Sequence, residues 1–168
     1  MARKMTMHKW FWAWDFEKEE RWLNEMAMNG WALCGVGYAT YHFEESEPGE
    51  YIIRTEMRDD DSRYISFMEE TGAEYVGRMM KWIFFRRKSE LGAFDIFSDI
   101  DSKLEHFKRI YRLIMLLGFA NLCIGIGNSL NATRIGWLSL LVCSLLMYGG
   151  GIIKGRIDSL EQDRVLRE

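Results

Sequence analysis

Aromatic side chains are the residues of this chain whose type and spacing could form a functional site. The stretch WFWAWDFEKEERWL, residues 10–23, holds four tryptophans and two phenylalanines. Trp10, Trp12 and Trp14 occupy every second position, a spacing that places side chains on one face of an extended strand. Such a row can be core, the wall of a site for an apolar or aromatic ligand, or a surface for a second subunit. A one-residue change of register exchanges the two faces, so the spacing leaves all three interpretations open.

Further candidates for the same site lie later in the chain. Trp82 and Phe84 share one face of the strand expected in AEYVGRMMKWIFFRRK. Arg54 and Arg58 share the polar face of the strand expected from YIIRTEM onward, and this face should lie on the open side of a sheet. The candidate ligand- or partner-binding residues are therefore Trp10, Trp12, Trp14, Trp82, Phe84, Arg54 and Arg58.

Sequence patterns for catalysis or metal binding do not occur in the chain. His8, His42 and His106 are scattered and match no metal-ligand spacing, and no glycine-rich phosphate loop precedes a helix. The three cysteines have no partner at metal or redox spacing. We therefore expect a protein that is not an enzyme and uses no metal or cofactor. Residues 1–108 carry 15 basic and 21 acidic residues, a net charge of −6, which argues against direct nucleic-acid binding.

The elements that would position these residues alternate between strand and helix patterns. Both expected helices end on a glycine, Gly30 and Gly72, and a strand follows each of them. The order is that of a ferredoxin-like βαββαβ sandwich, an α+β fold in which two helices cover one face of a four-stranded antiparallel sheet. Strands are expected at residues 8–16, 31–43, 51–57 and 73–88, and helices at 17–30 and 59–72.

Two runs without a charged residue follow, at residues 113–133 and 135–153. About 20 apolar residues cross the hydrocarbon layer of a bilayer, so these runs predict a two-helix transmembrane hairpin. Basic residues flank its open end, whereas Arg134 alone lies in the loop, and the positive-inside rule therefore places both termini in the cytoplasm of a two-pass cell-membrane protein. The flanking residues are Lys108, Arg109, Arg112, Lys154 and Arg156.

These patterns divide the chain into four parts. Residues 1–92 are expected to form the cytoplasmic ferredoxin-like domain, and residues 93–112 a connecting helix that enters the first span without a break. The hairpin occupies residues 113–153, and residues 154–168 form a cytoplasmic C-terminal tail.

Three blocks of sequence follow one another in the chain: WDFEKEERWLNEMAMNGWAL, YISFMEETGAEYVGRMMKWIFFRRK and FSDIDSKLEHFKR, which together cover most of residues 8–110. In this order they resemble the bacterial domain-of-unknown-function 2812 family. Members of that family are typically encoded beside PadR-like transcriptional repressors. Some of these pairs are linked to the control of drug or antimicrobial-peptide transporters. The resemblance implies a membrane partner in regulation or drug response, and it supplies no catalytic residues.

The sequence thus predicts a membrane-anchored regulatory or sensor protein. Its sheet domain would bind an apolar or aromatic small molecule, or a PadR-like repressor, and its hairpin would contact the lipid bilayer. In a third interpretation the protein is a homo-oligomer, and a second subunit covers the open sheet face. The alternative function is that of an accessory or structural subunit of a membrane transporter, held by its spans rather than by its sheet.

Overall fold

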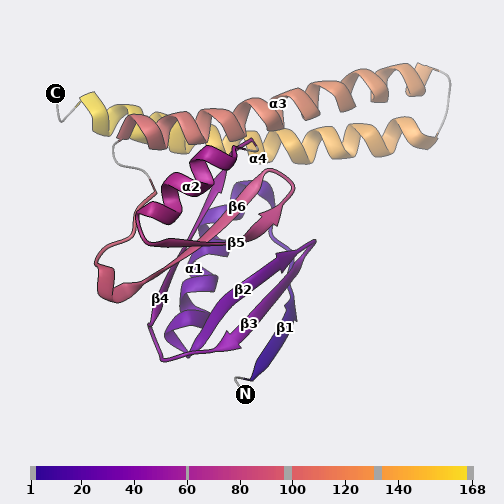
Figure 1. Ribbon diagram of the computed structural model, residues 1–168. Helices are drawn as coiled ribbons and strands as arrows, with labels where there is room; N and C mark the ends of the chain where they lie inside the picture. Colours follow the sequence, from indigo (N-terminus) through magenta and orange to yellow (C-terminus); the bar gives the residue numbers. More distant parts are fainter. Residues whose placement is uncertain (1–2, 60, 97–99, 131–133, 166–168) are drawn as a thin grey trace. The chain divides into compact units, whose positions relative to one another are not determined.

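A strand–helix–strand–strand motif occurs twice in the first part of the chain (Figure 1). The computed structural model describes residues 3–59, 61–96, 100–130 and 134–165, and the two motifs form an N-terminal unit over Met1–Ile96. The first motif comprises β1 (Lys4–His8), α1 (Phe16–Met28), β2 (Trp31–Gly37) and β3 (Thr40–Glu45). The second comprises β4 (Tyr51–Met57), α2 (Ser62–Glu70), β5 (Ala73–Met79) and β6 (Trp82–Lys88).

Each motif forms its own antiparallel sheet, and both sheets have the same strand order. The first strand pairs with the third and the third with the second, which gives β1-β3-β2 and β4-β6-β5. The register shifts at the same place in both second strands, between Leu33 and Gly35 in β2 and between Tyr75 and Gly77 in β5. The N-terminal unit is therefore an internal repeat in topology as well as in sequence pattern.

The α+β class predicted from the sequence is confirmed, but the strands are arranged differently. The pattern predicted one four-stranded sheet, whereas the described residues form two three-stranded sheets. Residues 31–43 and 73–88, each expected as one strand, contain tight turns that separate β2 from β3 and β5 from β6. Ala39 and Met80 at these turns have φ angles of 50° and 56°, a conformation uncommon for residues other than glycine. At these two positions the turns therefore lack the glycine or asparagine that is typical of hairpin turns.

The prediction of a strand at residues 8–16 is also wrong, because the strand ends where that prediction begins. β1 ends at His8 because its partner β3 begins at Thr40, and these two residues form the last pair of the ladder. Residues 9–12 lie outside any ladder, Ala13–Asp15 form a short 3-10 helix, and α1 begins at Phe16. The tryptophan row consequently lies on the connection between β1 and α1, and not on a sheet face.

Helix α1 closes an edge of the second sheet. Asn24 Nδ2 donates to the Ile53 carbonyl at 2.9 Å, and Asn24 Oδ1 accepts from the Ile53 amide at 2.9 Å. Glu20 Oε2, one helical turn away, accepts from the Thr55 amide at 2.9 Å. Four residues of helix rise by about 6 Å and two residues of strand by about 6.8 Å, so the two spacings match. The side chains of α1 thus take the place of a further strand beside β4.

In the C-terminal unit, Phe97–Glu168, the described residues form a pair of long antiparallel helices (Figure 1). Helix α3 covers Ile100–Leu130 and runs unbroken from the connecting segment into the first apolar run, while α4 covers Arg134–Val165. The predicted end of the first span, residues 131–133, lies outside the described residues. Beyond the apolar runs, ion pairs of 2.8 Å between Lys108 and Glu161 and 3.2 Å between Asp101 and Arg164 join the two helices.

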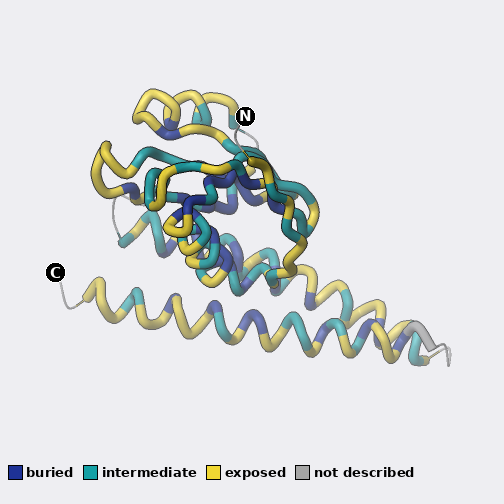
Figure 2. The backbone as a smooth tube through the Cα atoms, turned by 90° about the horizontal axis from the view of Figure 1, so that it is seen from below, coloured by how far each residue is buried: buried dark blue, intermediate teal, exposed yellow. Residues whose placement is uncertain are grey.

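Both helices are long and apolar enough to cross a membrane. Only 17% of the most apolar window of α3 and 28% of that of α4 are buried, whereas the core helix of a water-soluble protein would be mostly buried. Figure 2 shows exposed and intermediate positions interspersed with buried ones along the helices. The amide of Asn121 donates to the Leu117 carbonyl at 2.9 Å, so this polar side chain is satisfied within its own helix.

Candidate functional site

An aromatic cluster lies on the connection between β1 and α1 and on the β2–β3 turn. It consists of Trp10, Trp12, Trp14 and Tyr38, and we refer to it as the tryptophan cluster. Trp10 contacts Tyr38 at a ring-centroid distance of 5.6 Å and Trp12 at 5.7 Å, both in edge-on geometry. Trp12 stacks on Trp14 at 5.1 Å with parallel rings. The four rings form a continuous row from the surface toward the interior.

The exposure of these rings changes along the row. Tyr38 is 70% exposed, Trp10 52% and Trp12 42%, whereas Trp14 is only 8% exposed. Trp14 therefore belongs to the core and supports Trp12 from below. The outer three rings are large, apolar and in contact with solvent.

Two backbone hydrogen bonds hold this segment in place. The Lys9 amide donates to the Ala39 carbonyl at 3.1 Å and ties the segment to the β2–β3 turn. The Asp15 amide donates to the Trp12 carbonyl at 2.8 Å and closes the 3-10 turn that leads into α1. The cluster is thus presented by anchored backbone at both ends.

The opposite side of the same segment packs inward. The ring of Phe11 lies 5.7 Å from that of Trp22 and 6.4 Å from that of Tyr41, and Lys9 Nζ lies 4.4 Å from the Trp22 ring centroid. The side chains therefore alternate in direction, as the sequence spacing predicts, although the segment belongs to no sheet. Trp12 has extended backbone angles and Ala13–Asp15 form a 3-10 helix, so the alternation does not depend on a strand ladder.

One of these aromatic residues, Tyr41, is hydrogen-bonded to a buried acid. Glu19 on α1 is 4% exposed, and its Oε1 accepts a hydrogen bond of 2.6 Å from the hydroxyl of Tyr41, which is 1% exposed. Burial raises the pKa of Glu19, the neighbouring Glu20 carboxylate raises it too, and the hydrogen bond from Tyr41 opposes both. Burial also raises the pKa of Tyr41, and the Glu19 carboxylate adds to that effect.

Replacing Glu19 with glutamine should change how stability depends on pH. Because the folded protein has the higher pKa, the stabilising contribution of Glu19 is full below the unfolded value of 4.5 and is lost as pH rises through the folded value. The free energy of unfolding of the parent should therefore fall relative to that of Glu19→Gln as pH rises above 4.5. Urea unfolding of the full chain in detergent micelles, followed at several pH values, measures this difference.

Glu25→Gln is the control for the loss of one negative charge, because Glu25 is exposed on the same helix. A constant difference between parent and Glu19→Gln across the acidic range would contradict the raised pKa.

The other predicted site residues are not part of the tryptophan cluster. Trp82 is 9% exposed and stacks on Phe16 at 5.2 Å, and Phe84 is completely buried. Arg54 Nη1 lies 3.3 Å from Glu20 Oε1. Arg58 Nη1 lies 3.3 Å from Glu56 Oε1, and its guanidinium covers the ring of Tyr64 at 3.8 Å. The structure thus brings Trp10 and Trp12 together over Trp14, and it places the other four residues in core contacts and intramolecular ion pairs.

Sequence patterns do not reveal Tyr38 as a member of the tryptophan cluster, or Glu19 as the buried partner of Tyr41. The pattern predicts a strand interior at Tyr38, although the small residues that surround it in GVGYAT could have indicated a turn. Glu19 lies in a block of five charged residues, so nothing in its neighbourhood distinguishes it from a solvated helix face. Among the residues that the structure describes, no group of three or more His, Cys, Asp or Glu is placed to hold a metal ion.

A family model described as a protein of unknown function, DUF2812, matches residues 15–119. The chain belongs to this family. The DUF2812 match confirms the resemblance drawn from the three sequence blocks, and it reaches from the start of α1 into the first apolar run. It begins directly after Trp14, so Trp10 and Trp12 precede it and Tyr38 lies inside it. No curated protein and no solved structure matches this DUF2812 chain.

Proposed function

We propose that this protein is a membrane-anchored, non-enzymatic sensor whose N-terminal unit binds an apolar or aromatic small molecule at the tryptophan cluster. The observation that carries the proposal is the group of exposed rings formed by Tyr38, Trp10 and Trp12. Aromatic side chains supply large contact areas with few rotatable bonds, which makes them effective in binding sites. Occupancy of this site would alter the affinity of the protein for a PadR-like repressor, the partner that the family resemblance suggests.

The membrane part of the proposal rests on the hairpin. Only 17% and 28% of the most apolar windows of α3 and α4 are buried, and the bilayer would provide a partner for the apolar side chains that remain exposed. The distribution of basic residues favours a cytoplasmic position for both termini, and hence for the N-terminal unit. Compounds that partition into the membrane would reach such a unit at high local concentration.

Replacing Trp10 with alanine should weaken the binding of an apolar aromatic probe by about tenfold, because the probe loses one of its exposed ring contacts. N-phenyl-1-naphthylamine is a suitable probe, and energy transfer from tryptophan reports its binding to the full chain in nanodiscs. Trp12→Leu should have a similar effect, since it removes the central ring of the row.

Trp137→Ala is the matched control, because Trp137 is 74% exposed but lies on α4. Equal loss of binding in Trp10→Ala and Trp137→Ala would mean that the probe dissolves in lipid near any exposed tryptophan, and the proposed site would then be wrong. Circular dichroism of each variant establishes that the fold is retained.

The exposed hairpin faces favour a second candidate, an accessory subunit of a membrane transporter. Exposed large apolar residues occur on both helices, including Phe119, Ile126 and Leu141, and another membrane protein could cover them as well as lipid does. Exchange of the hairpin for an unrelated one separates the two candidates. If the spans hold a transporter, the exchange should abolish association with that transporter. If the N-terminal unit is the sensor, the exchange should leave binding of the aromatic probe unchanged.

A further inference from the structure

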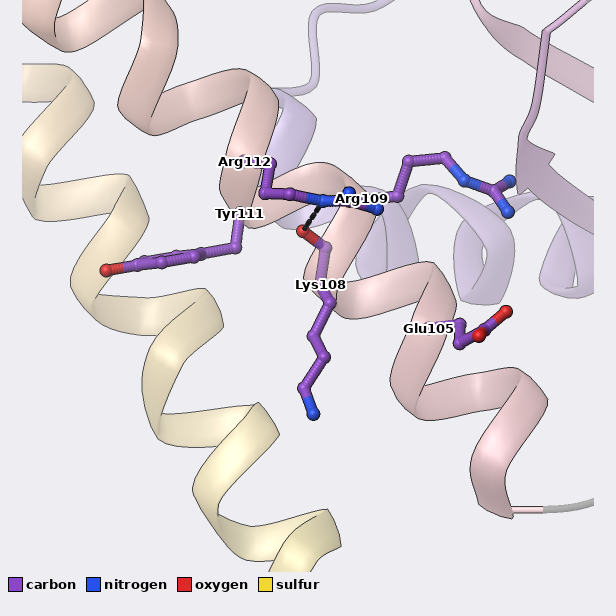
Figure 3. A pocket seen from close by; sticks show the side chains of 5 residues that line it. All are labelled: Glu105, Lys108, Arg109, Tyr111 and Arg112. Carbon is purple, nitrogen blue, oxygen red and sulfur yellow. Dashed lines mark hydrogen bonds between the residues drawn. The ribbon is translucent and has the colours of Figure 1, made fainter.

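A pocket opens on α3 immediately before its charge-free run (Figure 3). It has a volume of about 460 Å³ and is lined by Glu105, Lys108, Arg109, Tyr111 and Arg112. Residues 105, 108, 109 and 112 recur at intervals of three and four, so they share one face of the helix. Three of these side chains are basic and one is acidic, which gives the lining a positive charge.

The cations of this pocket differ in how far the protein neutralises them. Lys108 Nζ lies 2.8 Å from Glu161 of α4, so its charge is balanced. Arg112 Nε donates at 3.4 Å to the backbone carbonyl of Lys108, as the dashed line in Figure 3 shows. Within the described residues, no carboxylate lies within ion-pair distance of the Arg112 guanidinium. Arg112 therefore has donor groups available for an anion from outside the protein.

The position of Arg112 along the helix indicates where that anion would lie. Arg112 is the last charged residue before the apolar run that begins at Leu113. Its neighbour Tyr111 points toward α4 in Figure 3, and its ring lies 3.9 Å from the position that a Cβ would take on Gly150. If the apolar runs cross a bilayer, this level of the hairpin coincides with the phosphate layer of the lipid headgroups, where tyrosine and arginine are favoured.

We propose that Arg112 and the adjoining pocket bind the phosphate group of an anionic phospholipid from the cytoplasmic leaflet. The guanidinium is planar and can donate two parallel hydrogen bonds to phosphate oxygens, which a lysine ammonium cannot do in the same geometry. Tyr111 contributes an amphipathic ring at the same depth. This inference rests on the membrane anchoring proposed above and is independent of the tryptophan cluster.

The test separates lipid binding from anchoring. Flotation of the full chain with vesicles, after an alkaline wash, measures anchoring in pure phosphatidylcholine and in phosphatidylcholine mixed with phosphatidylglycerol. Native mass spectrometry of the detergent-purified chain then measures the affinity for added phosphatidylglycerol, phosphatidylcholine and inorganic phosphate. The parent should bind phosphatidylglycerol in preference to the other two.

Arg112→Gln should float as the parent does but bind phosphatidylglycerol about tenfold more weakly, since it loses a charge-assisted contact. Arg112→Lys should be intermediate, because it keeps the charge and loses the two-fold hydrogen bonding. Arg63→Gln is the control for charge loss, since the Arg63 side chain is 97% exposed on α2, outside the hairpin.

Unchanged affinity in Arg112→Gln would overturn the proposal while leaving the anchoring intact. Equal affinity for inorganic phosphate and phosphatidylglycerol would also overturn it, because the site would then bind free phosphate. Release of the parent from both vesicle types by the alkaline wash would overturn the anchoring and this inference together.

Discussion

Replacing Phe85 with alanine should lower the free energy of unfolding of the N-terminal unit by about 3–5 kcal/mol. Phe85 on β6 is completely buried and belongs to a core cluster with Met68, Ala73, Ile83 and Phe94. Alanine would remove the contact area of the ring and leave a cavity that the two flanking strands cannot close. Urea unfolding of the full chain in detergent micelles, followed by tryptophan fluorescence, measures the effect, because six of the seven tryptophans lie in residues 1–96.

Phe67 on α2 provides the matched control, since its ring is 58% exposed. Phe67→Ala should change the free energy of unfolding by no more than about 0.5 kcal/mol. A similar loss in both variants would show that the second sheet does not pack as described.

Replacing Gly125 with leucine should separate α3 from α4 along part of their contact. A Cβ on Gly125 would lie 2.7 Å from Leu140 Cδ2 and 3.3 Å from the Leu140 backbone nitrogen, and a backbone atom cannot move aside as a side chain can. Overpacking of this kind costs about 1–3 kcal/mol. Thermal unfolding in micelles, followed by circular dichroism, measures the loss, since α3 and α4 contain 31 and 32 residues and dominate the helical signal.

The nearby Gly127 makes the comparison specific, because a Cβ at this position would meet nothing within 4 Å. Gly127→Leu should unfold at nearly the same temperature as the parent. If the two variants lost stability equally, the cause would be helix propensity or micelle packing rather than close contact between the helices.

The parts of the fold that depend on local composition were predictable from the sequence. The charge-free runs correspond to the apolar parts of α3 and α4, because an apolar run of about 20 residues is long enough to favour a membrane-spanning helix over a short core element. The ends of α1 and α2 were recognisable at Gly30 and Gly72, whose φ angles of 82° and 85° are those that favour glycine. Asp61 accepts hydrogen bonds from the amides of Arg63 and Tyr64, as expected of an acidic residue at the start of α2.

The parts that depend on long-range pairing were not predictable in the same way. The length of β1 depends on where β3 begins. The last pair of their ladder joins His8 to Thr40, and these two residues are 32 positions apart in the sequence. The two hairpins have Ala39 and Met80 at positive φ, where glycine or asparagine is typical, so the residue types at these positions do not indicate a turn. In the candidate site, the spacing of Trp10 and Trp12 predicted a shared direction, but the burial of Trp82 and the contribution of Tyr38 depend on the tertiary fold.

The hydrogen bonds between Asn24 and Ile53 have a consequence for self-association. A peptide that extended the second sheet by strand addition at β4 would have to displace the Asn24 amide and give up both of these bonds. Exposed strand edges are the usual starting points of amyloid-like polymerisation. A helix that occupies this edge therefore protects the polypeptide from joining copies of itself into fibrils at β4, including when it is concentrated at a surface.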